Sequence, residues 1–333
     1  MKQKKLLLIL CGALALLLAV YLLAGGALKN KSQAEAQADE QARTIFSLDG
    51  LSRLAYTDGV NALSFTQSGG VWVSDAHEDW ALRQNYLKTL ETLLCGLKAE
   101  RVLEEPEALK VYGLNNPDYE ITMTDSAGTA HILRLALADN GVWYLSVDGE
   151  DRVYTVSSEL SESVGATLLE LVDYETAPSI TSDDISSVEL TYAGSVYLFR
   201  HAAAAQTGEG DAASSAQRIW TAEKDGAAIS VDSINIDSAA INLLDIVPTS
   251  CIAYDPTAEQ LAEYGFDAPL ATFKVTYEDE AGNAASYTLL IGKAYGDDAS
   301  SYTVMMDGGR AVTLADADNI GDLFPLLTST SAA

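Results

Sequence analysis

The stretch YGLNNP, Tyr112–Pro117, returns with small changes as YGFDAP, Tyr264–Pro269. The residues around the two copies agree as well. Strand-like runs, turn signals and one amphipathic helix follow the same order in both halves, with Trp72 and Trp220 at corresponding points. Because self-similarity at a fixed period indicates repeated structural units, we predict an internal duplication of about 130–150 residues per copy.

The glycine of each copy predicts a helix stop. Gly113 and Gly265 each follow a short helix-forming stretch, where a left-handed residue commonly ends the helix. The apolar residue after the glycine closes such a stop, and the proline leads into a strand. A non-glycine residue in the left-handed conformation would cost about 1–2 kcal/mol. The structural signature predicted in this way consists of Tyr112, Gly113, Leu114, Pro117, Tyr264, Gly265, Phe266 and Pro269.

The N-terminus predicts a membrane segment. Lys2, Lys4 and Lys5 precede an uncharged apolar run, Leu6–Leu28, which as a helix would reach about 34 Å and cross a hydrocarbon core of about 30 Å. The run exceeds the apolar region of about 7–15 residues in a cleaved signal peptide, which favours an uncleaved anchor. Small residues at Ala24–Ala27 leave cleavage open. The lysines favour a single pass through the cytoplasmic membrane, with the N-terminus inside and the bulk of the chain extracytoplasmic.

The charge of the chain is strongly negative. Its 333 residues include 20 Lys and Arg against 48 Asp and Glu, a formal net charge of −28 at pH 7. Such a surface repels nucleic acid and anionic lipid, and it indicates either solubility outside the cell or a surface that steers cations. Cys95 and Cys251 are interpreted as small buried hydrophobes, with a disulfide between them left open.

These patterns predict an α+β fold of two tandem related domains, each a mostly antiparallel β-sheet with packed helices, after one N-terminal transmembrane helix. The predicted parts are residues 1–28 as the anchor or signal peptide, 29–43 as a polar stalk, 44–176 as repeat domain 1, 177–328 as repeat domain 2 and 329–333 as a tail. Within the second domain, residues 202–217 are small and polar and predict a surface loop.

The histidines and acids do not form a recognisable catalytic pattern. His77, His131 and His201 show no metal-ligand spacing to one another or to a cysteine. A hydrolase would require acids such as Glu104, Glu105 and Asp118 to converge. The sequence therefore predicts neither an enzyme nor a cofactor.

One acidic stretch invites comparison with a calcium loop. DADNIGD, Asp316–Asp322, has acids at the first and third positions but Ile320 at the fifth and Leu327 at the twelfth, where a bidentate Glu is needed. We expect Asp316 or Asp318 to cap a helix instead, and we expect no metal site.

Two longer strings carry a family resemblance. LKAERVLEEPEALKVYGLNNP, Leu97–Pro117, and DGEDRVYTV, Asp148–Val156, look like the domain-of-unknown-function 4340 family, with the second half of the chain as a more diverged copy. The resemblance implies a bacterial envelope protein associated with auxiliary components of ABC-type export systems. It implies no catalytic residues.

The resulting functional expectation is a non-enzymatic, membrane-anchored protein that acts by protein–protein contact. Its expected partners are envelope proteins such as ABC transporter components, beside an accessory role in export or transport. The alternative is an extracellular protein that binds a small molecule or glycan in a pocket lined by Tyr and Trp.

Overall fold

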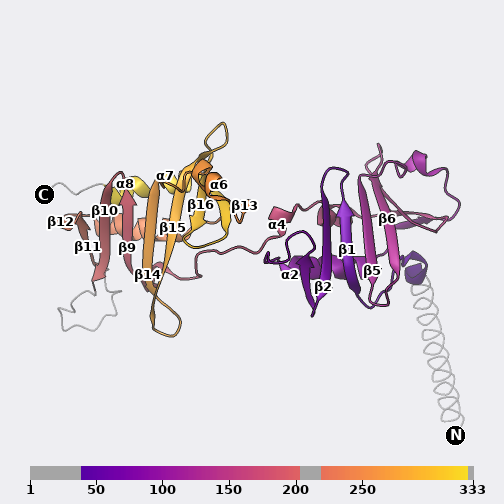
Figure 1. The fold of residues 1–333 in the computed structure, drawn as a ribbon, viewed down its shortest axis with the longest axis horizontal. Helices are drawn as coiled ribbons and strands as arrows, with labels where there is room; N and C mark the ends of the chain where they lie inside the picture. Colours follow the sequence, from indigo (N-terminus) through magenta and orange to yellow (C-terminus); the bar gives the residue numbers. More distant parts are fainter. Residues whose placement is uncertain (1–38, 203–218, 329–333) are drawn as a thin grey trace, which may run out of the picture. The chain divides into compact units, whose positions relative to one another are not determined.

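The computed structural model describes residues 39–202 and 219–328 (Figure 1). The chain divides between Thr167 and Leu168 into two compact units, called unit 1 and unit 2 below. The predicted anchor at residues 6–28, the tail at 329–333 and most of the predicted stalk and loop lie outside the described residues. Within the described ranges, no helix is long and apolar enough to cross a membrane.

Unit 1 is built on an antiparallel sheet whose eight described strands lie in the order β3-β2-β1-β5-β6-β7-β8-β4. Its first two hairpins turn at Gly59 and at Gly69-Gly70, where glycine supplies the left-handed backbone that tight turns require. The strands are β1 (Leu51–Thr57), β2 (Ala62–Ser68), β3 (Val71–Ser74), β4 (Arg101–Leu103), β5 (Tyr119–Asp125), β6 (Ala130–Leu137), β7 (Trp143–Val147) and β8 (Val153–Val156).

Unit 2 repeats this strand order. Its sheet reads β12-β11-β10-β9-β14-β15-β16-β17-β13, so each strand of unit 1 has a counterpart and β12 is added at one edge. The strands are β9 (Ile185–Tyr192), β10 (Ser195–Ala202), β11 (Ile219–Lys224), β12 (Ala227–Ile229), β13 (Ser250–Tyr254), β14 (Ala271–Glu278), β15 (Ala284–Tyr295), β16 (Ser301–Met306) and β17 (Ala311–Asp316). The predicted class of mostly antiparallel sheets with packed helices is confirmed.

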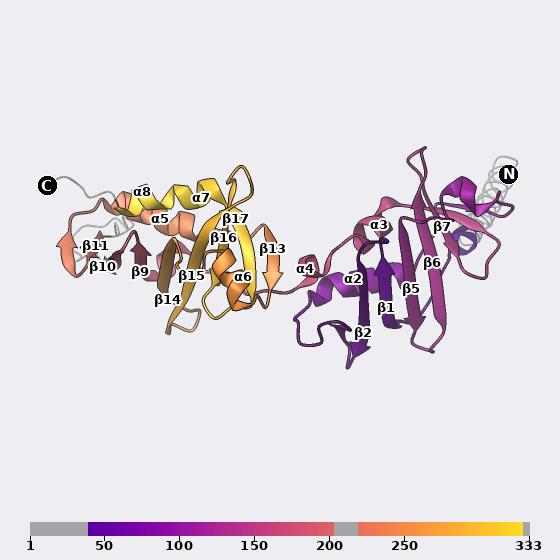
Figure 2. The same cartoon turned by 45° about the horizontal axis from the view of Figure 1, so that its top comes forward.

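Helices pack on the sheets; in Figure 2, α5, α7 and α8 run along one face of the unit 2 sheet. Ile236 and Leu243 of α5 lie in one core cluster with Phe273 and Ile291 of the sheet. The described helices are α2 (Gln84–Cys95), η1 (Leu109–Tyr112) and α3 (Ser158–Val164) in unit 1, and α4 (Leu168–Leu171), η2 (Ser182–Asp184), α5 (Ser233–Leu244), α6 (Ala258–Glu263), α7 (Ala317–Gly321) and α8 (Leu323–Thr328) in unit 2.

The repeated motif of unit 1 forms a Schellman stop. Gly113 is left-handed, with φ 79°, and its N–H donates to Lys110 C=O over 3.4 Å. The N–H of Leu114 donates to Leu109 C=O over 3.1 Å, which completes the pair of bonds. The helix that it ends is a single 3₁₀ turn, η1, rather than an α-helix.

The repeated motif of unit 2 has the same hydrogen bonds. Gly265 has φ 88°, and its N–H donates to Ala262 C=O over 3.0 Å. The N–H of Phe266 donates to Leu261 C=O over 2.8 Å. Here the stop ends α6, which opens with a capping box between Thr257 and Gln260.

Each stop lies against a small residue of the sheet. A Cβ added at Gly113 would stand 3.2 Å from Ala136 Cβ on β6. In unit 2 a Cβ added at Gly265 would stand 2.9 Å from Lys293 N, and one added at Gly292 would stand 2.3 Å from Tyr264 O. Leu135 pairs with Tyr119, the first residue of β5, and Ile291 pairs with Ala271, the first residue of β14. Ala136 and Gly292 directly follow these residues and therefore correspond. We call the contact of Gly113 with Ala136, and that of Gly265 with Gly292 and Lys293, the glycine dock.

The glycine dock of unit 1 buries an apolar side chain. Leu114 is only 1% exposed and forms a small core cluster with Ala136 and Val153. Leu109, the expected partner of Leu114 within the stop, is 38% exposed. Leu114 is therefore buried mainly by the sheet.

A tryptophan ties one strand of each sheet to its main helix: Trp72 on the edge strand β3, and Trp220 on β11, next to the edge strand β12. The indole Nε1–H of Trp72 donates to Glu91 of α2 over 3.2 Å, and Glu91 also accepts from Leu51 N–H over 3.0 Å. In unit 2, Trp220 Nε1–H donates to Asp237 of α5 over 2.6 Å. Both indoles are buried, so the carboxylates satisfy donors that would otherwise have no partner.

A side chain also pairs with the backbone of the edge strand β3. The amide of Gln84 accepts from Trp72 N–H over 2.8 Å and donates to Trp72 C=O over 2.9 Å. Such pairing blunts an edge that could otherwise recruit another strand.

Replacing Gly265 by Ala is expected to destabilise unit 2 more than replacing Gly308 by Ala. Both positions are left-handed, so each variant carries a strain of about 1–2 kcal/mol. Only at Gly265 would the new Cβ also meet backbone, since nothing lies within 4 Å of the corresponding point at Gly308. Urea unfolding of the full chain, read by hydrogen exchange on unit 2 peptides, measures the difference. Equal losses would contradict the glycine dock.

Replacing Glu91 by Ala is expected to destabilise unit 1 by about 1.5–3 kcal/mol, because three donors, on Trp72, Leu51 and Gln67, lose a charged acceptor. Glu91→Gln keeps an acceptor and should lose less. Glu100→Ala serves as the control, since Glu100 is exposed. Urea unfolding read on unit 1 peptides compares the three variants. A loss in Glu91→Ala no larger than in the control would refute the role assigned to this carboxylate.

Candidate functional site

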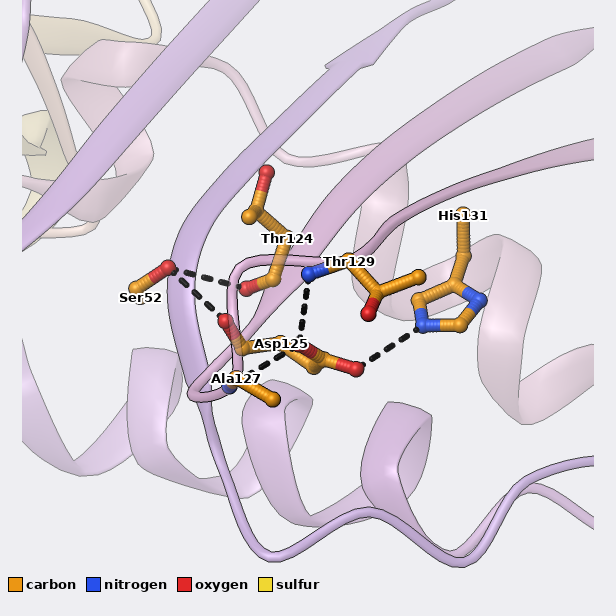
Figure 3. A network of polar contacts seen from close by, with 6 residues as sticks. All are labelled: Ser52, Thr124, Asp125, Ala127, Thr129 and His131. Atoms are coloured by element: carbon orange, nitrogen blue, oxygen red, sulfur yellow. Dashed lines mark hydrogen bonds and ion pairs between the residues drawn. The ribbon is translucent and has the colours of Figure 1, made fainter.

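The strongest candidate for chemistry is a histidine–aspartate pair in unit 1 (Figure 3). His131 Nε2 lies 3.2 Å from Asp125 Oδ2, and their side chains are 20% and 13% exposed. The other carboxylate oxygen of Asp125 accepts from Ala127 N–H over 2.9 Å and from Thr129 N–H over 2.8 Å. Asp125 therefore holds the β5–β6 hairpin and the histidine together.

Ser52 lies at the same network but does not complete a catalytic relay. Its hydroxyl is directed at the backbone carbonyls of Thr124 and Asp125, at 3.2 and 3.1 Å. A nucleophilic serine would instead donate to the imidazole that is to take its proton. Figure 3 shows Asp125 between Ser52 and His131. The arrangement fixes the hairpin to β1 rather than activating a nucleophile.

The charge of Asp125 is stabilised by these bonds. The N–H of Thr129 lowers the pKa of the Asp125 carboxyl below its ordinary value, with further lowering from His131 and Ala127. The folded hairpin therefore favours the ionised carboxylate.

The corresponding hairpin of unit 2 keeps the aspartate but not the histidine. Asp279 accepts from Ala281 N–H over 2.9 Å and from Asn283 N–H over 2.8 Å, and these bonds lower its pKa as well. Counted from Pro117 and Pro269, His131, which pairs with Met123, and Tyr287, which pairs with Val275, lie at the same register, so Tyr287 takes the histidine's place. The unit 2 hairpin extends farther beyond this point, since Asp279 lies eight residues before Tyr287 and Asp125 only six before His131. The turn is thus a repeated structural device, whereas the histidine belongs to unit 1 alone.

The other two histidines lie elsewhere. His77 stacks on Trp80 with 4.0 Å between ring centroids, and His201 lies 5.6 Å from the ring of Trp220. Within residues 39–202 and 219–328, no group of three or more His, Cys, Asp or Glu side chains could hold a metal ion.

The three acids that a hydrolase would need take part in separate contacts. Glu104 acts electrostatically on Tyr154, whose buried hydroxyl donates to Glu150; burial and these acids raise the pKa of Tyr154 well above its ordinary range. Asp118 accepts from Leu137 N–H over 2.7 Å. Glu105 is exposed.

The acidic stretch near the C-terminus caps a helix. Asp316 accepts from Asp318 N–H over 2.8 Å at the start of α7. Cys95 and Cys251 are not joined in a disulfide.

The signature tyrosines are held inside their own units. The hydroxyl of Tyr112 accepts from Glu107 N–H over 3.0 Å, and its ring lies 4.9 Å from that of Tyr144. The carbonyl of Tyr264 accepts from Thr303 Oγ1 over 2.8 Å and from Lys293 N–H over 3.1 Å.

The remaining signature residues lie around these tyrosines. The ring of Phe266 lies 3.3 Å from where a Cβ on Gly292 would stand. Pro117 and Pro269 are half-buried and directly precede the residues that lead into β5 and β14. The signature residues thus make contacts within their own units.

Sequence reasoning missed the acceptors of the two tryptophans and the position of Tyr287. A signal existed for the acceptors, since each repeat places one acid within the helix that follows its tryptophan: Glu91 in unit 1 and Asp237 in unit 2. No pattern singled out Tyr287, because strand tyrosines are common in this chain.

Comparison with known families gives one match. Residues 72–228 match the family described as Domain of unknown function (DUF4340). The match begins at β3 and ends in β12, so it crosses the division between the two units. The resemblance predicted from the sequence is confirmed for a single copy, and the comparison gives no second one. No curated protein and no solved structure matches the chain.

Replacing Asp125 by Asn is expected to destabilise unit 1 near pH 6 but less in acid. Asn retains the oxygen that accepts from the hairpin N–H groups and loses the charge facing His131. Because the folded pKa of Asp125 lies below the ordinary value of about 3.9, its charge stabilises the fold above that pH and ceases to do so as pH falls through the lowered pKa.

Urea unfolding between pH 3 and pH 7 measures this dependence. Asp279→Asn is the matched control, because its hairpin has the same turn bonds without a histidine. A loss in Asp125→Asn that is the same at pH 3 and pH 6 would contradict the proposed role of the charge.

Proposed function

We propose that this chain is a non-enzymatic, membrane-anchored extracytoplasmic protein that acts by protein–protein contact, accessory to an ABC-type export or transport system. The basic N-terminus followed by the apolar run Leu6–Leu28 supports a single-pass anchor with the N-terminus inside. The match over residues 72–228 supports the resemblance to the DUF4340 family, and the envelope assignment is what that resemblance implies.

We further propose that both units are copies of one domain, the second more diverged. The shared strand order and the two Schellman stops support this. A duplicated unit offers the same surface twice, which suits a protein that bridges or scaffolds others.

The single observation that carries the contact function is that exposed apolar side chains lie on or next to the segments that form each stop. In unit 1, Val111 is 52% exposed and Leu137 is 48% exposed, and Leu137 directly follows the docked Ala136. In unit 2, Leu270 and Tyr295 are each 38% exposed. Tyr295 is close enough to influence the pKa of Tyr264. A contiguous patch of exposed apolar side chains is typical of contact sites, and we propose that these side chains form one.

The polar networks support the same proposal. Of the side chains that the sequence offered for chemistry, His131 lies against Asp125, Asp118 accepts from Leu137 N–H, and Asp316 caps α7. These contacts give them structural roles.

A second candidate, an extracellular small-molecule or glycan-binding protein, is favoured by one observation. Unit 2 contains an interior cavity lined by Tyr287. That cavity is taken up in the next subsection.

The contact function is tested in membranes that contain the full chain. The double variant Val111→Asp, Leu137→Asp should reduce co-purification of ABC permease and ATPase subunits about ten-fold or more relative to the wild type, because charges would enter the apolar surface. Val60→Asp is the control, since Val60 is 89% exposed at the tip of the β1–β2 hairpin.

Thermal unfolding should be the same for the double variant and the control. Failure of the wild type to recover any transporter subunit, under mild detergent conditions that preserve complexes, would count against the proposed function. Equal recovery with the double variant and the control would reject this surface.

A further inference from the structure

Unit 2 contains a buried hydroxyl without a hydrogen-bond partner. Tyr287 is 9% exposed, and its Oη makes no hydrogen bond within the described residues. Burial raises the pKa of Tyr287 to about 12, so the phenol is neutral and able to donate at physiological pH. Buried polar groups are usually paired, so this one indicates a missing partner.

The side chain lines an interior cavity. The cavity has a volume of about 20 Å³, with further walls that include Leu243, Leu289, Val304, Met306 and Thr313. That space holds about one water molecule. The walls are mainly apolar, and Tyr287 Oη is the one buried hydroxyl among the lining residues for which no partner is found in the described part of the chain.

A surface groove lies directly outside the cavity. The groove has a volume of about 530 Å³ and is lined on its apolar side by Ile180, Ile241 and Val247. Val247 is 67% exposed and Ile241 is 49% exposed. Thr176, Ala177, Ile246 and Pro248 line both spaces. Thr176 and Ala177, which we call the strap, and the loop residues Ile246 and Pro248 therefore lie between the groove and the cavity that contains the unpaired hydroxyl.

The repeat shows how the two units differ at one wall of this cavity. Tyr154 pairs with Leu145 on β7, and Thr313 pairs with Val304 on β16 at the corresponding register. Unit 1 thus places a tyrosine ring where unit 2 has a threonine. Tyr154 is 2% exposed, and its hydroxyl donates to Glu150. In unit 1 the tyrosine occupies this register position and its hydroxyl is paired; in unit 2 Thr313 occupies it, lines the cavity and donates to Val304 C=O.

We propose that unit 2 binds one small, uncharged, mainly apolar molecule in the groove and cavity, with Tyr287 Oη–H donating to the single hydrogen-bond acceptor of that molecule. The apolar body lies along Ile241 and Val247, and the strap residues Thr176 and Ala177 move apart to join the two spaces. A pocket of several hundred Å³ with one placed polar group suits a ligand of this size. This site uses different residues from the contact surface and does not depend on the contact function.

The charge around the site selects against anions. Asp245 lines the groove and Glu175 lines the cavity. The whole chain carries a formal net charge of −28. A carboxylate-bearing molecule of the same shape would therefore bind less well than an alcohol.

Isothermal titration calorimetry of the full chain with 1-octanol, and separately with octanoate, tests the proposal. The two probes share an apolar chain and differ in charge. We expect 1-octanol to bind and octanoate to bind at least ten-fold more weakly. Tyr287→Phe should weaken 1-octanol binding about five-fold, the loss expected for one neutral hydrogen bond.

Two further variants keep the test decisive. Val247→Asp, at an exposed wall of the groove, should also weaken binding without affecting folding. Tyr192→Phe is the control, because Tyr192 stacks on Phe324 of the same unit away from the residues that line either space. The proposal is overturned if 1-octanol does not bind the wild type, if Tyr287→Phe binds it as the wild type does, or if a crystal grown with 1-octanol shows only a water at Tyr287.

Discussion

The close approach of a glycine to a small residue of the neighbouring strand is the constraint on which both units depend. Gly113 lies on Ala136, and Gly265 lies on Gly292 and Lys293. Because no larger side chain fits between them, the segment that crosses from one sheet edge to the start of the next hairpin can lie flat on the sheet. In unit 1 that segment buries Leu114. A Schellman stop is thus used as a packing surface.

The two sheets share their strand order but carry different side chains at two corresponding positions of their interior. One register position holds His131 in unit 1 and Tyr287 in unit 2; another holds Tyr154 and Thr313. In unit 1 these side chains pair with carboxylates. In unit 2 the smaller threonine leaves space and the tyrosine hydroxyl has no partner. Duplication conserves the sheet while freeing individual core positions to change.

The sequence allowed prediction of the sheet-rich fold class and of the left-handed glycines, because both rest on local patterns: alternation along strands, and Gly113 and Gly265 after short helical stretches. Ala136 and Gly292 could not be recognised, since a small residue inside a strand has no local signal that another segment will press on it. The acceptor role of Glu91 and the empty space beside Tyr287 depend likewise on contacts between distant residues.

Native-state amide hydrogen exchange at Leu114 and Phe266 tests the glycine dock most directly. If the stops are integral to the sheets, these amides, bonded to Leu109 and Leu261, should exchange as slowly as the amides of β6 and β15 in the same unit. Exchange as fast as that of the exposed residues Asn115 and Asp267 would show that the stops open independently of the sheets, and would contradict the dock as the organising contact of the fold.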